Sequence, residues 1–128
     1  MMSALNIASM GLGAADLRMQ ASASNIANMQ SAGSTGPSGP QAYAPVRVDQ
    51  SSLPGGGVEA KTSSITPASV RRYQPDSQLA DAQGFVSMPN VDMIAEVTNM
   101  VSAKNGFAAS LQVMQASSDM IKKLYELD

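Results

Sequence analysis

The sequence predicts a mainly α-helical protein whose two long terminal helices pack as an antiparallel coiled-coil pair, with a short extended or β-hairpin module between them. Apolar residues recur at helical spacing at both ends of the 128-residue chain, and a segment rich in Gly, Ser and Pro separates these ends. We expect a coiled-coil helix over residues 1–30, a flexible linker over 31–41, the middle module over 42–90 and a long helix over 91–128. The C-terminal helix is expected to pack with the N-terminal helix.

The N-terminal segment has apolar residues at seven-residue spacing and no proline, which is typical of a coiled-coil helix. These residues are Leu5, Leu12, Met19 and Ile26, and the positions between them are held by Ala8, Ala15, Ser22 and Met29. Gly11 and Gly13 each weaken a helix by about 1 kcal/mol relative to Ala. Their presence favours either a partner helix that compensates for this loss or a close approach that requires small residues.

The middle of the chain changes in character after residue 30. Ser, Gly and Pro dominate residues 31–40, which cannot continue a helix or a sheet ladder and therefore predict a linker. Beyond the linker, apolar residues such as Val46 and Val48 alternate with polar ones, and Pro54 opens a glycine-rich turn. Few windows are strongly apolar, so a β-hairpin module and a disordered arm are comparable alternatives, with the hairpin slightly favoured.

The C-terminal segment returns to a helical pattern after Pro89. Asn90 or Asp92 can cap its start, and a helix of this length, about 50 Å, predicts an elongated molecule. Its apolar stripe includes Met93 and Tyr125 and is widened by Ile94, Val101 and Ala108. The predicted assembly seam combines residues from both helices: Leu5, Leu12, Met19, Ile26, Val97, Met100, Phe107, Leu111, Met114 and Ile121. A methionine-rich stripe of this kind serves as a core or, alternatively, as an adaptable interface.

The composition excludes most hydrolytic mechanisms. The chain has no His and no Cys, which removes Ser-His and Cys-His catalysis and His-ligated metal sites. Asp76 and Asp81 are the nearest carboxylate pair, but their spacing in a loop is weak evidence for acid–base chemistry. The net charge of −2 argues against nucleic-acid binding, and no phosphate-binding glycine loop is present. We therefore expect no enzyme activity, no cofactor, no metal and no small-molecule substrate.

Two segments resemble a known family. Ala23, Ser24, Asn25, Ile26, Ala27 and Asn28 close the N-terminal helix as in flagellar rod and hook proteins, and Pro89, Asn90, Val91 and Asp92 lie in a segment similar to the C-terminal part of the FlgC-type proximal rod proteins. The resemblance implies a structural subunit of the bacterial flagellar basal-body rod. Its helices are then expected to form the inner layer of a helical tube, together with other rod proteins and copies of itself, and to transmit torque.

The resemblance also implies a route out of the cytoplasm. The N-terminus lacks the basic start and long apolar stretch of a secretory signal, and no run approaches the roughly 20 apolar residues of a membrane span. The resemblance implies export by the flagellar type III apparatus without a cleaved signal and a place in the periplasmic rod, and the missing signal pattern agrees with this expectation. The alternative is a soluble helical adaptor or export-related module that folds on one partner.

Overall fold

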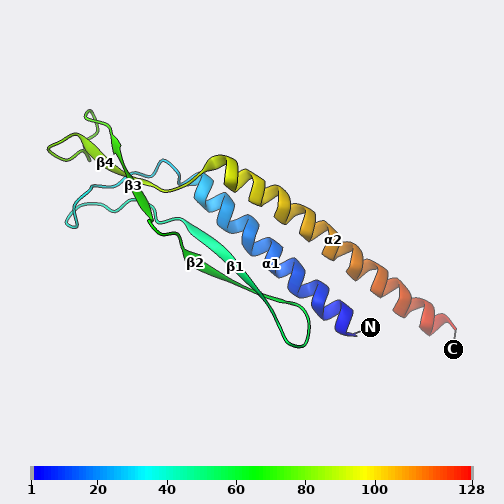
Figure 1. Ribbon diagram of the computed structural model, residues 1–128. Helices are drawn as coiled ribbons and strands as arrows, with labels where there is room; N and C mark the ends of the chain where they lie inside the picture. Colours follow the sequence, from blue (N-terminus) through cyan, green and yellow to red (C-terminus); the bar gives the residue numbers. More distant parts are fainter. Residues whose placement is uncertain (1, 128) are drawn as a thin grey trace.

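The computed structural model describes residues 2–127, which form two long helices and four short strands (Figure 1). In chain order these are α1 (Met2–Ala27), β1 (Val46–Ser52), β2 (Val58–Ser64), β3 (Ser69–Tyr73), β4 (Phe85–Pro89) and α2 (Met93–Glu126). The predicted pair of long terminal helices with a small β-containing middle is confirmed. Of the alternatives for the middle, the hairpin is the one observed.

The two helices lie side by side and run in opposite directions, so that both chain termini lie at one end of the molecule (Figure 1). α2 has 34 residues and is therefore about 50 Å long. Its start is fixed by Asp92, whose side chain accepts from the backbone N–H groups of Ile94 and Ala95, which would otherwise lack a partner. Asp92 is thus the N-cap, and Asn90 instead donates to the Pro67 carbonyl oxygen.

The β1–β2 hairpin packs along α1 and forms one of two separate two-stranded sheets (Figure 1). Its antiparallel register pairs Val46 with Ser64 at one end and Ser52 with Val58 at the other. The glycine-rich turn reaches α1 beside Ile7, where Gly56 has a φ of 88°. An L side chain rarely adopts this conformation, so glycine is required for the turn.

The β3–β4 hairpin stands beyond the junction of the two helices and is tied to the predicted linker. The Gly33 N–H donates to the Ser87 carbonyl oxygen at 2.8 Å, and the Ser87 N–H donates back at 2.9 Å. Val86 and Met88, on either side of Ser87 in β4, are buried. Residues 31–41 contain turns without a regular helix or strand, and their start is held against β4.

Candidate assembly interface

The face between α1 and α2 is lined mainly by small side chains. On α2, Glu96, Ala103 and Ser117 are buried and Ser110 is half-buried, all at intervals of seven residues. On α1 the matching buried positions are Ala8, Ala15 and Ser22. Repetition every seven residues keeps one stripe of a helix turned toward its neighbour, and small side chains let the two backbones approach closely.

Three contacts define how the two helices are aligned. A side chain added at Gly11 would begin 2.6 Å from the Ser110 hydroxyl oxygen, so the close approach expected at this glycine is confirmed, whereas Gly13 has no atom nearby. Further along α1, Arg18 donates to the Ser102 hydroxyl at 3.4 Å, and Asn25 donates to Glu96 at 3.0 Å. Successive contacts on α1 are seven residues apart, which fixes one antiparallel register.

The structure divides the predicted assembly seam into two groups. Eight of its residues flank the helix–helix face and are half-buried: Leu5, Leu12, Met19, Ile26, Met100, Phe107, Met114 and Ile121. The other two, Val97 and Leu111, are 43% and 41% exposed and lie away from α1. A role of these ten residues in assembly stays a prediction.

The small residues of α2 that meet α1 were not predicted from the sequence. The predicted seam consists mainly of large apolar side chains, and Ala103, Ser110 and Ser117 are small and only weakly hydrophobic or polar. The signal that could have found them is their seven-residue spacing with Glu96, opposite a similar repeat in α1. In a closely packed helix pair, small size marks the contact face better than hydrophobicity does.

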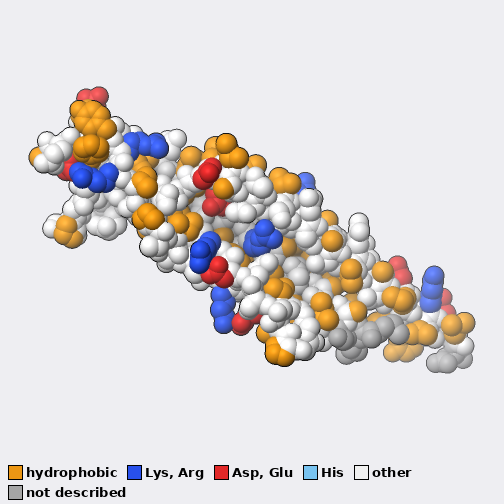
Figure 2. Space-filling model, viewed as in Figure 1, with side chains coloured by type: hydrophobic (Ala, Val, Ile, Leu, Met, Phe, Trp, Pro, Cys, Tyr) orange, Lys and Arg blue, Asp and Glu red, His pale blue; other side chains and the backbone are white. Residues whose placement is uncertain are grey.

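A second apolar stripe on α2 faces solvent within the single chain. Its members are separated by three, four or seven residues and so share one side of the helix: Ile94, Val97, Val101, Ala108 and Leu111. Between Glu96 and Asp119 the only charged residue is Lys104. In Figure 2, orange and white atoms cover most of the half of the molecule that carries the chain termini, and charged groups gather over the middle of the molecule and near the C-terminal end. Such a face is typical of a surface that a partner covers.

The two family motifs lie where the helices and the β-module meet. Ala23, Ser24 and Ala27 are exposed and Ile26 is half-buried, whereas Asn25 is completely buried. The Asn28 side chain donates to the Ser24 carbonyl oxygen near the end of α1. In the second motif, Pro89 is buried at the end of β4 and Val91 is half-buried before the Asp92 cap.

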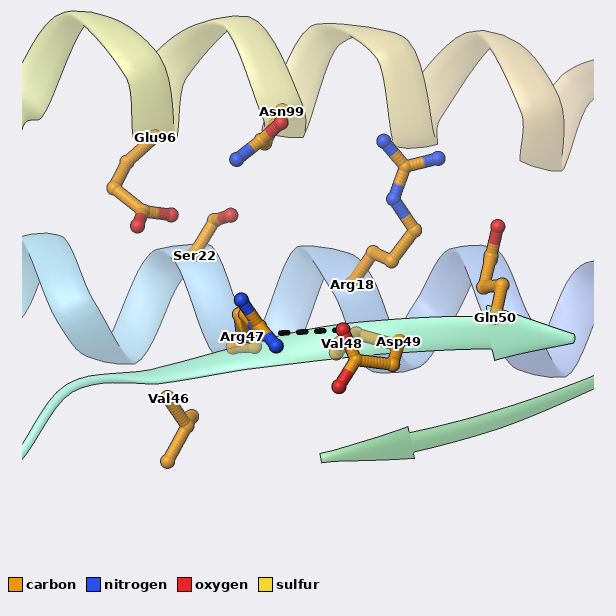
Figure 3. Close-up of a pocket in the computed structure, with 10 residues that line it drawn as sticks. Arg18, Ser22, Val46, Arg47, Val48, Asp49, Gln50, Glu96 and Asn99 are labelled. Atoms are coloured by element: carbon orange, nitrogen blue, oxygen red, sulfur yellow. Dashed lines mark ion pairs between the residues drawn. The ribbon is translucent and has the colours of Figure 1, made fainter. Parts of the chain in front are cut away.

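A polar cavity of about 360 Å³ lies beside this junction, between α1, α2 and β1 (Figure 3). Glu96 and Asn99 reach it from α2, and Arg18 and Ser22 reach it from α1. On β1, Arg47 pairs with Asp49 at 3.1 Å at its rim. Charges of both signs line the cavity, so it has no clear preference for an anion or a cation.

Asp81, one of the two aspartates considered for acid–base chemistry, has a structural role in the β3–β4 hairpin. Its carboxylate accepts from the Phe85 and Gln83 N–H groups, from the Thr35 hydroxyl and from Arg71. The Phe85 bond is the main cause of its lowered pKa, which burial partly opposes. Within residues 2–127, no three metal-binding side chains come together and no helix is long and apolar enough to cross a membrane.

An elongated helix pair with a solvent-facing, charge-poor apolar stripe is typical of structural proteins that assemble through their helices. Comparison with known proteins agrees with this class. A family model described as "Flagellar basal body rod FlgEFG protein C-terminal" matches residues 82–127. The flagellar basal-body rod protein FlgC of Yersinia enterocolitica is 38% identical over 98% of both chains.

Relatives of the same name come from other bacteria. The chain is 35% identical to FlgC of Salmonella typhimurium over 95% of its length and 93% of the relative. It is 30% identical to FlgC of Agrobacterium fabrum over 97% of its length and 92% of the relative. The chain therefore belongs to the FlgC family of flagellar basal-body rod proteins. This is a family of structural rod components and not a class of enzymes.

Proposed function

We propose that this chain is a subunit of the proximal rod that assembles through its two terminal helices, with copies of itself and with related rod proteins, and so transmits torque. The observation that carries the proposal is the exposed apolar stripe of α2, Ile94, Val97, Val101, Ala108 and Leu111. Heterologous contacts between such faces would extend a helical tube, because they need not close into a ring.

The energetics of the stripe favour association. Burying a large aliphatic side chain is worth roughly 1.5–3 kcal/mol, so covering four of them offsets a substantial part of the entropy lost on assembly. Within the described chain the most buried apolar residues are chiefly alanines, with Val86 and Met88 the larger exceptions. A single subunit thus has a thin core and gains stability from neighbours. We infer that neighbouring helices cover the stripe by coiled-coil packing.

We also propose that the subunit passes through the flagellar type III export apparatus and joins the rod in the periplasm. A thin core supports this route, because a chain that must unfold to pass a narrow channel benefits from low stability beforehand. The apolar stripe would then be covered only at the growing rod.

The test introduces a charge into the stripe by Leu111→Asp and beside the helix–helix face by Leu12→Asp. A buried unpaired carboxylate is costly, so both variants should be lost from purified basal bodies and should abolish motility in a strain lacking the native gene. The control is Gln78→Glu, which adds the same charge at an exposed position of the loop between β3 and β4, outside both helices.

The level of secreted chain separates failed export from failed assembly. Normal motility of both Leu→Asp variants would contradict assembly through these helices. A chain absent from purified rods but recovered in a one-to-one complex would support the adaptor alternative instead.

A further inference from the structure

The small-residue face between α1 and α2 does not by itself select one register. Ala8, Ala15 and Ser22 repeat every seven residues on α1, and Ala103, Ser110 and Ser117 repeat at the same interval on α2. If α2 slid along α1 by seven residues, side chains of similar size would face each other again. Repeats of this kind therefore need an additional feature that distinguishes one alignment from the next.

Asn25 supplies a feature that occurs once. Its side chain is 0% exposed, and its amide nitrogen donates to the Val46 carbonyl oxygen at 2.7 Å and to Glu96 Oε1 at 3.0 Å. Its amide oxygen accepts from the Val46 N–H at 3.1 Å and from the Tyr43 hydroxyl at 3.0 Å. Two donors and two acceptor positions are all that a side-chain amide possesses, so every one of them is used.

These four bonds join three parts of the molecule. Asn25 lies near the C-terminal end of α1, Glu96 lies in the first turn of α2, and Val46 begins β1. The amide meets both backbone groups of Val46 as a neighbouring strand would. Glu96 is only 8% exposed and extends from α2 toward α1 (Figure 3).

A slip of seven residues would break this network. With Gly11 moved from Ser110 to Ser117, Asn25 would face Ala103, which has no acceptor in its side chain. Glu96 would lose its donor in a largely buried place, and an unsatisfied buried polar group is expensive. The burial of small side chains would hardly change, so the hydrogen bonds of Asn25 account for the difference in free energy between the two registers.

We propose that Asn25 is a positioning residue that locks the antiparallel register of α1 against α2 and attaches the start of β1 to the locked pair. The lock acts within one chain, so its test does not depend on rod assembly. A partner amide or carboxylate outside the chain is not needed, because Glu96, Val46 and Tyr43 satisfy Asn25 completely.

The chain has no cysteine, which permits a direct measurement of register. A Cβ built on Gly11 lies 3.6 Å from the Ser110 Cβ, within the range of a disulfide, so Gly11→Cys with Ser110→Cys reports the observed register. Gly11→Cys with Ser117→Cys reports the slipped register, because seven residues of α2 place position 117 about 10 Å further along the helix. Each pair is oxidised in the purified full chain at low concentration, and the yield of intramolecular disulfide is measured by mass spectrometry.

The decisive substitutions change the bonding of Asn25 at nearly constant size. Asn25→Asp turns both donor bonds into contacts between acceptors, and Asn25→Leu removes all four bonds. We expect each to lower the ratio of 11–110 to 11–117 disulfide by about tenfold, since each leaves buried groups unpaired. The matched control is Asn28→Asp in the same motif, whose side chain bonds only to nearby residues of its own segment and should leave the ratio unchanged.

A second change separates hydrogen bonding from simple packing. Glu96→Gln alone keeps an acceptor oxygen and should leave the ratio near that of the native sequence. Combined with Asn25→Asp, it supplies an amide donor to the new carboxylate and should restore much of the 11–110 disulfide. Unchanged ratios in both Asn25 variants would overturn the lock. If helical circular dichroism is lost in either variant, the double variant decides: recovery supports the lock, and failure to recover overturns it.

Discussion

Ala103 offers a test of how closely the two long helices approach each other. It is 0% exposed on α2, between the contacts that Glu96 and Ser110 make with α1. Ala103→Leu would add three carbon atoms where no space is open, so the helices must separate or the side chain must leave its preferred rotamer. Overpacking of this kind costs about 1–3 kcal/mol. For a chain of this size, about 2 kcal/mol lowers the melting temperature by roughly 5–10 °C.

The assay is thermal unfolding followed by helical circular dichroism, with Ala108→Leu as the control. Ala108 is on the same helix but exposed, so the same substitution adds its carbon atoms to the solvent side and should change the melting temperature little. An Ala103→Leu chain as stable as the Ala108→Leu chain would refute close packing at this face.

Three further predictions concern other parts of the fold. Val86→Ala should destabilise the chain by about 2 kcal/mol, measured by urea unfolding, because Val86 of β4 is completely buried. A loss below that of an exposed Val→Ala change such as Val101→Ala would contradict this. Asp92→Ala should lower the free energy of unfolding by about 1 kcal/mol, because it removes the cap of α2. Asp92→Asn should keep most of this stabilisation, and equal losses in both variants would argue against capping. The pKa of Asp81 is lowered in the folded chain, so ionised Asp81 stabilises the fold at pH values above the ordinary pKa of 3.8. This stabilisation is lost as the pH falls through the lowered pKa of the folded chain. The protection of the Phe85 amide against hydrogen exchange, taken relative to the intrinsic exchange rate at each pH, should fall at acidic pH. Asp81→Asn should remove that pH dependence, and an unchanged profile in the variant would exclude Asp81 as the cause.

Long elements could be predicted well from the sequence, and their exact contact face could not. Seven-residue spacing of Leu5 and Leu12, and of Phe107 and Met114, correctly indicated two long helices. The apolar spacing also placed Val97 in the predicted seam, and in the structure Val97 is exposed on a neighbouring stripe of α2. Hydrophobicity marks which residues prefer to be covered, but a long helix has several such stripes and the sequence alone does not say which neighbour covers each.

The candidate site shows the same division at Asn25. The family motif drew attention to this residue. In the structure it bonds to Val46 and Glu96, which are 21 and 71 residues away along the chain. No local pattern could identify these partners, because they meet only after the helices and the hairpin have packed.

By itself the sequence determined that this is a chain of two long helices around a small extended module, poor in catalytic side chains and related to flagellar rod proteins. The two helices and the lack of catalytic side chains follow from residue type and spacing, which act locally along the chain, and the relation to rod proteins rests on the resemblance of two segments. Tertiary structure alone decided the antiparallel register, the small-residue face and the buried junction around Asn25. They depend on distances between segments far apart in sequence, where backbone approach and hydrogen-bond satisfaction select one arrangement among several that the pattern allows.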